Sequence, residues 1–146
     1  MKILILCTGN SCRSQMAEGI LRAINSELEI FSAGTKPEAV VNPHAITVMK
    51  EIGIDISSQQ PAHINQFIGN SFDYVITVCD HARESCPVFI GEIKNKLHIG
   101  FQDPATARGS EAEILPVYRK IRDEINEAFT KFYHKNHIYG TGKKTS

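Results

Sequence analysis

A cysteine and an arginine stand six positions apart in the stretch CTGNSCRS, residues 7–14. The apolar run KILIL precedes Cys7, and small residues with one glycine separate it from Arg13. A loop that leads from a strand into a helix N-terminus turns successive backbone N–H groups inward, where they can hold a tetrahedral oxyanion. The guanidinium of Arg13 adds a planar fork for two of the oxyanion's oxygens. The same positive field favours the thiolate, so we expect Cys7 to have a depressed pKa and to act as a nucleophile.

The residues between these two form the predicted oxyanion-binding loop, which comprises Thr8, Gly9, Asn10, Ser11, Cys12 and Arg13. Ser14 follows the loop and can donate a hydrogen bond to the Cys7 thiolate. The side chain of Cys12 need not face the anion, and we expect it to pack in the core. A buried cysteine beside a surface arginine is the alternative, but the preceding strand, the following helix and the internal glycine favour the catalytic interpretation.

Two further reactive residues follow predicted strands. Cys79 comes directly after the strand at 73–78, and Asp103 comes shortly after the strand at 96–101. In parallel α/β sheets, ligands bind outside the carboxyl ends of the strands. We therefore expect Cys7, Cys79 and Asp103 to converge in one crevice, although they are far apart in the sequence.

Hydrophobic periodicity predicts the elements that position these residues. Strands are expected at residues 2–6, 28–32, 73–78 and 96–101. Helices are expected at residues 14–25, 43–52 and 64–69, and from near Ser110 or Glu113 to Tyr133. Alternating strands and helices predict one α/β domain, with a four-stranded parallel sheet flanked by helices on both faces.

The start of the last helix has two readings. Ser110 and Glu113 can form a capping box, whereas Pro116 would then lie beyond the first turn and remove a backbone hydrogen bond. Residues 1–133 are assigned to the domain, and the polar, glycine-punctuated residues 134–146 to a flexible tail.

Composition excludes several classes of protein. The 146 residues fit one domain, and 16 acidic residues balance 16 basic ones, so we expect neither a nucleic-acid partner nor a membrane surface. The longest apolar runs are too short to span a bilayer, and no signal-peptide pattern opens the chain. With an adequate core, the four cysteines indicate a reducing compartment rather than structural disulfides. We expect a cytoplasmic monomer.

Taken together, these motifs resemble the low-molecular-weight tyrosine phosphatase superfamily, whose loop has the form C-x5-R-S. More narrowly, the chain is similar to the thioredoxin-coupled arsenate reductases that share this fold. The matching stretches are CTGNSCRSQMAEG (7–19), SAG (32–34), NPHAI (42–46), DIS (55–57), VITVCDHARESCP (75–87), GFQDPA (100–105) and IRDEI (121–125).

The resemblance implies a reaction that needs three thiols. Arsenate would bind in the loop, Cys7 would attack arsenic, and Asp103 would act as the general acid. Cys79 would then attack the sulfur of Cys7 and release arsenite, and Cys86 would attack Cys79. The resemblance also implies thioredoxin as the electron donor, with no tightly bound cofactor, because two thiols supply the two electrons.

Two features favour a reductase over a phosphatase. The segment CDHARESCP carries the pair Cys79 and Cys86, which the phosphatases do not need. The phosphatases usually have an aromatic residue after the Asp-Pro pair, whereas Ala105 and Thr106 stand here and suit a small inorganic anion. The alternatives are a low-molecular-weight phosphatase that hydrolyses phosphoesters and a redox sensor that switches through Cys79 and Cys86. A sensor would need neither Arg13 nor Asp103.

Metal and cation sites have weaker support. The spacing of Cys79, His81 and Cys86 does not fit a zinc knuckle, and the six histidines are scattered, so we predict no metal site. The reductases can use positions that match Asn10, Glu18 and Ser32 around the loop, in part to bind a monovalent cation. We expect Asn10 to brace the loop and Glu18 to be solvated, and a monovalent cation remains open.

Oxidation is predicted to unwind residues 80–90. If residues 79–86 formed one helix, the Cα atoms of Cys79 and Cys86 would lie about 10 Å apart. A disulfide requires a separation of roughly 4.4–6.8 Å, so the segment would have to loop out. Hydrogen exchange of the reduced and oxidised proteins tests this expectation, and equal protection of residues 80–90 in the two states would contradict it.

Overall fold

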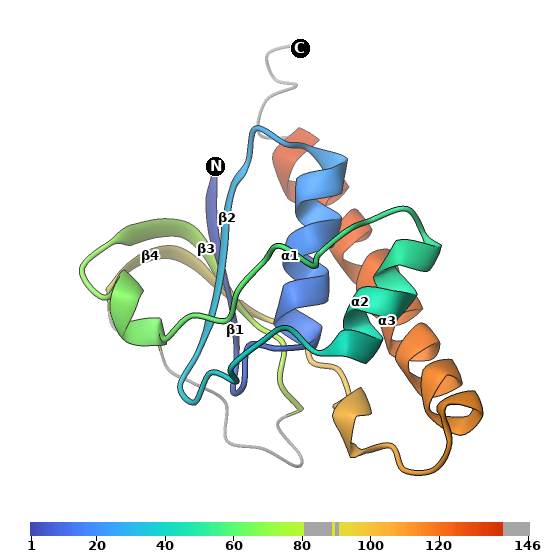
Figure 1. Cartoon of the computed structure of the whole chain (residues 1–146). Coiled ribbons are helices and arrows are strands. Elements are labelled where there is room, and N and C mark those ends of the chain that lie inside the picture. Colours follow the sequence, from blue (N-terminus) through green and yellow to red (C-terminus); the bar gives the residue numbers. More distant parts are fainter. Residues whose placement is uncertain (81–88, 90, 139–146) are drawn as a thin grey trace.

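The chain alternates strands and helices along its length. The computed structural model describes residues 1–80, 89 and 91–138. Within them, Figure 1 shows β1 (Lys2–Cys7), α1 (Arg13–Ile24), β2 (Glu29–Gly34), α2 (Pro43–Glu51), the 3-10 helix η1 (Ile64–Phe67), β3 (Ser71–Thr77), β4 (Glu92–His98), the 3-10 helix η2 (Pro104–Thr106), α3 (Glu111–Tyr133) and the π-helix η3 (His134–Ile138). The predicted α/β class is confirmed.

Strand β1 lies inside a four-stranded parallel sheet whose order is β2-β1-β3-β4. Cys7 at its end pairs with Gly34 of β2, and Leu6 pairs with Thr77 of β3. The carboxyl ends of these three strands therefore meet at one edge, at the bottom of the molecule in Figure 1. Whatever follows β1, β2 and β3 in the sequence is brought together at this edge.

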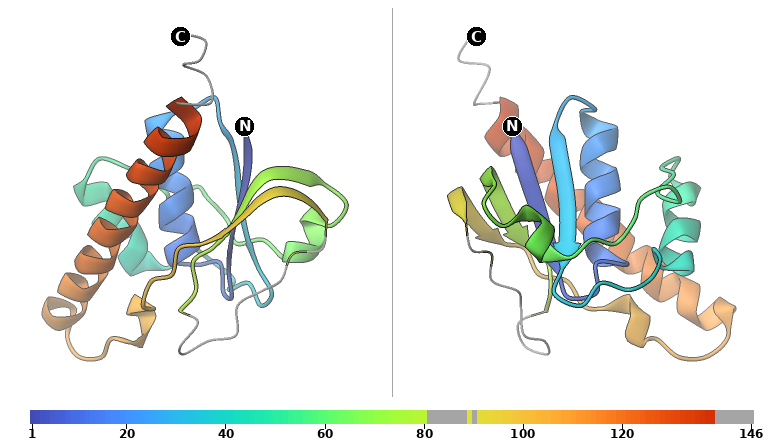
Figure 2. Two further views of the ribbon diagram at one scale, coloured as in Figure 1. Left: turned by 180° about the vertical axis from the view of Figure 1, so that it is seen from behind. Right: turned by 60° about the vertical axis from the view of Figure 1, so that its left-hand side comes forward.

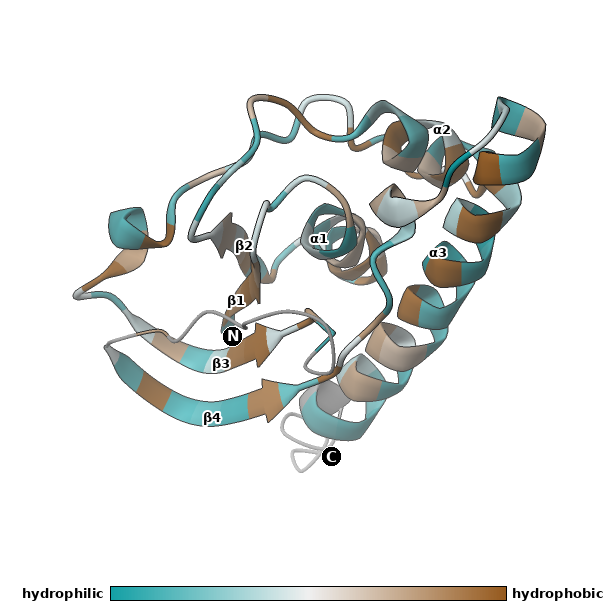
Figure 3. Ribbon diagram, turned by 90° about the horizontal axis from the view of Figure 1, so that it is seen from below, coloured by the Kyte–Doolittle hydropathy of each residue, from teal (hydrophilic) through white to brown (hydrophobic). Residues whose placement is uncertain are grey.

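The two faces of the sheet are covered differently. Ile3 and Ile5 of β1 belong to a core that includes residues of α1, α2 and α3, and Leu4 and Leu6 belong to a smaller core with Ile64 of η1. Viewed from below, the three α-helices lie together on one side of the sheet, and Figure 2 shows the same arrangement from two other sides (Figures 2 and 3). Helices thus flank both faces as predicted. Three α-helices cover the first face, whereas among the described residues the second face is covered by the short 3-10 helix η1.

Helix α3 begins at Glu111, which resolves its uncertain start. The Glu113 carboxylate accepts hydrogen bonds from the backbone N–H and the hydroxyl of Ser110, at 3.0 and 3.1 Å. Pro116 lies inside the helix and costs about 3 kcal/mol. The buried face of α3 outweighs this cost, since each fully buried large side chain contributes about 1.5–3 kcal/mol. Its buried apolar residues are Tyr118, Ile121, Ile125, Phe129 and Phe132.

The fourth strand was predicted too late in the sequence. It spans Glu92–His98 instead of residues 96–101, because an edge strand that is largely exposed lacks a strong apolar signal. The apolar residues that suggested the later range still extend the ladder. The backbone N–H groups of Ile99 and Phe101 donate to the carbonyls of Thr77 and Val78, at 2.9 and 3.1 Å.

The chain beyond Tyr133 continues as η3, where a flexible tail was expected. Tyr74 of β3 donates a hydrogen bond from its hydroxyl to Asn136 Oδ1 at 3.1 Å, which ties this turn to the sheet. Cys86, residues 139–146 and most of the segment 80–90 lie outside the described residues, so the predictions made for them stay predictions. No helix in the described part of the chain is long and apolar enough to cross a bilayer.

Glu51 links α2 to α3 and predicts a pH-dependent stability. Its carboxylate accepts hydrogen bonds from Arg119 at 2.9 Å and Arg122 at 2.8 Å. These bonds, first that of Arg119, hold the pKa of Glu51 below its usual value of 4.5. A carboxyl whose pKa is lowered by folding stabilises the protein above the usual pKa, and this contribution is lost as the pH falls through the folded pKa.

We therefore expect Glu51→Gln to lower the melting temperature at pH 7, and the difference from the unmodified protein to shrink below pH 4.5. Thermal unfolding followed by circular dichroism across this range measures it. Glu127→Gln is the control, because Glu127 pairs with the exposed Lys131 one turn away on the same helix. A Glu51→Gln difference that is independent of pH would contradict the assignment.

Candidate active site

The loop between β1 and α1 turns its carbonyl groups outward. The carbonyl oxygens of four consecutive residues, Thr8 to Ser11, accept hydrogen bonds of 2.8–3.0 Å from outside the loop, donated by the backbone N–H groups of Lys36, Glu38 and Asn42 and by the side-chain amide of Gln15. In a trans peptide the N–H group points away from the carbonyl group. The N–H groups of residues 9–12 therefore point inward, which makes the loop a cradle for an anion.

Asn10 holds the curl of this loop. Its backbone is left-handed, with φ of 49°, and its side chain is completely buried. Its Nδ2 donates to the hydroxyls of Ser14 (2.8 Å) and Ser32 (2.9 Å), and its Oδ1 accepts from the Ala62 N–H (2.7 Å). An asparagine tolerates this conformation better than most residues. Asn10 thus braces the loop, as expected from the sequence.

Arg13 connects the loop to Asp103. The guanidinium is buried, and its Nη1 donates to the carbonyl of Phe101 at 3.0 Å. Its Nη2 lies 3.7 Å from Asp103 Oδ2. The other carboxylate oxygen of Asp103 accepts from the N–H of Ala105 at 2.9 Å, which fixes the side chain at the start of η2. The Asp103 side chain remains about one-third exposed (34%), so it can exchange a proton with a bound anion or with water.

These groups surround one cavity of about 530 Å³ at the carboxyl edge of the sheet. Its lining residues are Cys7, Thr8, Gly9, Asn10, Ser11, Cys12, Arg13, Thr35, Lys36, Glu38, Asp103 and Ala105. The structure therefore brings the predicted nucleophile, the complete loop and the predicted acid together. Ser14 lies behind the loop, where its hydroxyl accepts the hydrogen bond from Asn10.

Cys79 is placed next to this cavity without lining it. The preceding residue, Val78, donates its N–H to the carbonyl of Leu6 at 3.0 Å, so Cys79 lies near the end of β1 where Cys7 stands. Its side chain is completely buried. Cys79 is disulfide-bonded, whereas Cys7 and Cys12 are not part of a disulfide. Cys86 lies outside the described residues.

Cys12 lies in the same core as Cys7, between the sheet and the helices, and is 5% exposed. Burial, followed by the charge of Asp103, raises the pKa of the Cys12 thiol far above its ordinary value. The thiol therefore stays protonated at neutral pH and is a poor nucleophile. This agrees with its predicted place in the core.

Two residues of the site, Lys36 and Glu38, were missed from the sequence, and one, Glu18, was misjudged. Lys36 and Glu38 line the cavity, and their position directly after β2 could have identified them by the rule that ligands bind at the carboxyl edge. Glu18 was expected to be solvated but is only 7% exposed, because it faces Ser32 and Arg22. No group of three or more His, Cys, Asp or Glu side chains in the described ranges is arranged to hold a metal ion.

Comparison with known proteins identifies the family to which this chain belongs. Residues 2–139 match the family described as low molecular weight phosphotyrosine protein phosphatase. Over 131 residues, covering 89% of this chain and 93% of the relative, the chain is 46% identical to an arsenate reductase of Halalkalibacterium halodurans. It is 44% identical to an arsenate reductase of Bacillus subtilis, with the same coverage.

Solved structures of arsenate reductases resemble this chain as well. An arsenate reductase in its reduced state superposes with a TM-score of 0.72 at 31% identity, and an arsenate reductase in a phosphate-binding state superposes with a TM-score of 0.68 at 28% identity. Each comparison covers 92% of this chain and 98% of the other chain. A thioredoxin-dependent arsenate reductase of Corynebacterium glutamicum gives 0.56 at 24% identity and covers 89% of this chain and 60% of the other, a likeness of fold alone.

The close approach of Gly34 to the loop predicts a specific loss of anion binding. A Cβ atom at Gly34 would lie 2.2 Å from the Thr8 carbonyl oxygen, so Gly34→Ala must displace the loop backbone. We expect a loss of about 1–3 kcal/mol in stability. We also expect about tenfold weaker binding of inorganic phosphate, equivalent to about one hydrogen bond of the cradle. Calorimetric titration and thermal unfolding measure the two effects.

Gly53→Ala is the matched control for this substitution. Gly53 has a φ of 81° and no atom within 4 Å of its would-be Cβ, so alanine there introduces backbone strain of about 1–2 kcal/mol without steric contact. It should lower stability and leave the phosphate affinity unchanged. Equal phosphate affinities in the two variants would show that Gly34 does not shape the cradle.

Proposed function

Because the chain belongs to the low molecular weight phosphotyrosine protein phosphatase family, we propose that it is an arsenate reductase in which Cys7 attacks a bound arsenate. The observation that carries the proposal is the single cavity that holds the Cys7 thiol, the cradle of backbone N–H groups, Arg13 and Asp103. The chain's similarity to arsenate reductases over most of its length supports the same reaction.

In the first step, arsenate binds in the cradle with its oxygens on the loop N–H groups and the Arg13 guanidinium. The Cys7 thiolate attacks arsenic and forms a sulfur–arsenic bond. One arsenic–oxygen bond breaks, and its oxygen leaves as water with a proton from the Asp103 carboxyl. Asp103 suits this role because its Oδ2 lies 3.7 Å from Arg13 Nη2, beside any anion that the guanidinium binds.

The second step requires that the disulfide of Cys79 has been reduced by an external dithiol, and the Cys79 thiolate then attacks the sulfur of Cys7. The sulfur–arsenic bond breaks, and its electron pair stays with arsenic, which leaves as arsenite. A Cys7–Cys79 disulfide forms, so the two thiols supply the two electrons that arsenic gains. The hydrogen bond between Val78 and Leu6 supports this step, because it keeps the ends of β3 and β1 adjacent.

In the third step, Cys86 attacks Cys79, which frees Cys7 and leaves a Cys79–Cys86 disulfide. An external dithiol must reduce this disulfide, and we propose thioredoxin for this role. Since Cys79 is completely buried, the dithiol would attack the sulfur of Cys86. The cycle needs a compartment that keeps Cys7 reduced, such as the cytoplasm. Cys7, Arg13 and Asp103 lie in one cavity of the chain, and we propose that a monomer carries out the cycle.

A phosphatase is the second candidate, because the same cradle and nucleophile can hydrolyse a phosphoester. The wall of the cavity argues for the smaller substrate. Ala105 lines it beyond Asp103, and none of its described lining residues is aromatic, so nothing among them would stack on a phenol ring. We expect weak ester hydrolysis as a side activity.

The decisive experiment follows NADPH consumption with arsenate, thioredoxin and thioredoxin reductase. Cys79→Ser and Cys86→Ser should each lower multiple turnover by at least about 10³-fold, because a relay cannot proceed without either nucleophile. A single-turnover assay separates the two variants. Cys86→Ser should still release one arsenite per chain and accumulate a Cys7–Cys79 disulfide, whereas Cys79→Ser should release none.

Hydrolysis of p-nitrophenyl phosphate by the same proteins is the control, since of the three cysteines it needs Cys7 alone and should survive both substitutions. Fast ester hydrolysis without any arsenate-dependent turnover would make the protein a phosphatase. Arsenate turnover that persists in Cys79→Ser would exclude the relay.

A further inference from the structure

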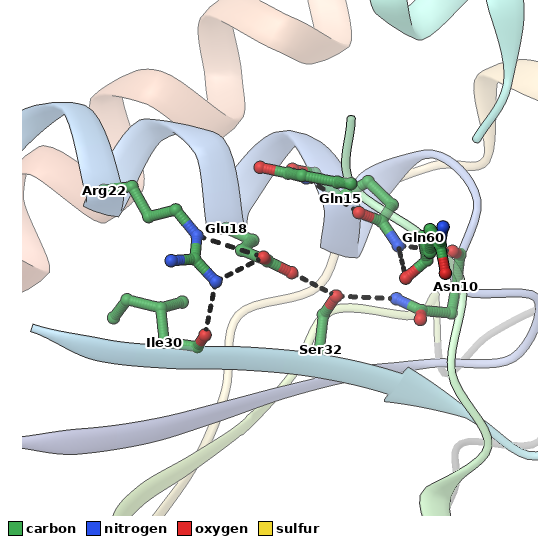
Figure 4. Close-up of polar contacts among 8 residues, drawn as sticks. Asn10, Gln15, Glu18, Arg22, Ile30, Ser32 and Gln60 are labelled. Atoms are coloured by element: carbon green, nitrogen blue, oxygen red, sulfur yellow. Dashed lines mark hydrogen bonds and ion pairs between the residues drawn. The ribbon is translucent and has the colours of Figure 1, made fainter. Parts of the chain in front are cut away.

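A chain of hydrogen bonds runs from the surface of α1 to the oxyanion loop. Figure 4 shows its members in a row. Arg22 donates from Nε and Nη2 to Glu18 Oε2 at 3.1 and 2.8 Å. The Ser32 hydroxyl donates to Glu18 Oε1 at 2.6 Å, and Asn10 Nδ2 donates to the oxygen of the same hydroxyl at 2.9 Å.

The Glu18 carboxylate in this row of hydrogen bonds is almost completely shielded from solvent. The Glu18 side chain is 10% exposed, whereas that of Arg22, one turn later on the helix, is 50% exposed. A carboxylate removed from water is costly unless a cation and hydrogen bonds compensate it. Within the described residues, Arg22 is the cation that forms an ion pair with Glu18. Arg22 also donates from Nη2 to the carbonyl of Ile30 at 2.8 Å, which fixes the guanidinium against β2.

The Glu18 carboxylate sets the donor-to-acceptor direction of the hydrogen bonds in this row. A carboxylate can only accept, so the Ser32 hydroxyl must donate to it and has only its lone pairs left for Asn10. Asn10 must then present its NH₂ group to Ser32, which leaves its Oδ1 for the N–H of Ala62 at 2.7 Å. The Ala62 N–H can only donate, so it holds Asn10 Oδ1 and leaves Nδ2 facing Ser32, whose hydroxyl proton is directed at Glu18. The Glu18 carboxylate thus holds Ser32, and Ser32 helps to hold the Asn10 side chain that braces the loop.

The oxygen atoms of this cluster already accept hydrogen bonds from protein donors. This decides whether the site can also hold the monovalent cation that the family resemblance allows. Glu18 Oε2 and the Ile30 carbonyl both accept from Arg22, Glu18 Oε1 accepts from Ser32, and Asn10 Oδ1 accepts from Ala62. A bound cation would need several of the same oxygens. The residues present therefore do not fit such an ion, because a guanidinium already stands against the carboxylate.

We propose that Arg22 is a positioning residue for the oxyanion loop, and that its guanidinium supplies the positive charge at Glu18 that a bound monovalent cation would otherwise supply. Arg22 is not among the described residues that line the cavity. It acts through Glu18, Ser32 and Asn10, and keeps the loop N–H groups aimed at the cavity before an anion arrives. The inference rests on the proposed function only in that the loop binds an oxyanion.

The test measures inorganic phosphate binding by calorimetry and the KM and kcat for arsenate, in potassium chloride and in choline chloride of equal ionic strength. The variants are Arg22→Met, Arg22→Lys and the double variant Glu18→Gln/Arg22→Met. Lys131→Met is the matched control, because Lys131 and Glu127 form an ion pair of the same spacing on α3, with both side chains exposed.

Arg22→Met should weaken phosphate binding and raise the KM for arsenate by about tenfold, the usual effect of losing an outer partner of a site, with a smaller change in kcat. Arg22→Lys should recover most of the affinity, because it restores the charge. The double variant should bind phosphate better than Arg22→Met, because it leaves no buried carboxylate without a partner. Potassium should strengthen phosphate binding by Arg22→Met alone, and Lys131→Met should behave as the unmodified protein.

Two outcomes would overturn the proposal. Phosphate affinity that is unchanged in Arg22→Met would show that the loop does not depend on the ion pair. A several-fold gain of affinity in the unmodified protein on replacing choline with potassium would show that Arg22 does not replace the cation. If Arg22→Met does not fold, Arg22→Lys and the potassium response of the unmodified protein still decide. A protein that binds phosphate as expected but reduces no arsenate would overturn the proposed function and leave this inference intact.

Discussion

The active-site loop depends on one constraint, which is that its carbonyl oxygens must find hydrogen-bond donors on the outer side. Only then can the opposite edge of each peptide face the cavity. The segment after β2 meets this demand with the N–H groups of Lys36, Glu38 and Asn42, and α1 meets it with the Gln15 amide. The parallel pairing of β1 and β2 makes this possible, because it places the start of that segment beside the loop.

The rest of the site follows from the position of the loop. Helix α1 starts at Arg13, so the arginine proposed to bind the anion is also the first residue of the helix that packs on α3. Asp103 comes from the end of the ladder beyond β4, and it is held by η2 and lies near Arg13. Three separate connections of one sheet thus contribute to a single cavity.

The sequence predicted most of the fold and the main residues of the site. The spacing of Cys7 and Arg13 and the apolar runs around them were sufficient, since a buried strand and an amphipathic helix have clear patterns. The edge strand β4 was misplaced because its side chains are mostly exposed, and apolar residues beyond its end carried the stronger signal. The start of α3 stayed open because Pro116 contradicts the capping box of Ser110, and only the burial of the following residues decides which effect prevails.

The burial of Glu18 could not be predicted, because a charged residue on an amphipathic helix is ordinarily exposed. What reverses this expectation is its position opposite Ser32, across a helix–strand contact that no local pattern encodes. Arg22 was overlooked for the same reason. Glu18 and Arg22 act on the loop only through the row of hydrogen bonds that ends at Asn10. That row joins α1 to β2 and forms only when the protein folds.

The cradle recognises its ligand by negative charge and tetrahedral shape, and phosphate shares both properties with arsenate. In the proposed reaction, selection must therefore come after binding. Phosphorus does not accept the electron pair that the sulfur–arsenic bond gives to arsenic, so a phosphate ion that occupies the loop can only leave again. The enzyme would be occupied by phosphate part of the time, and the phosphate concentration around it would set how much arsenate is needed before reduction becomes effective.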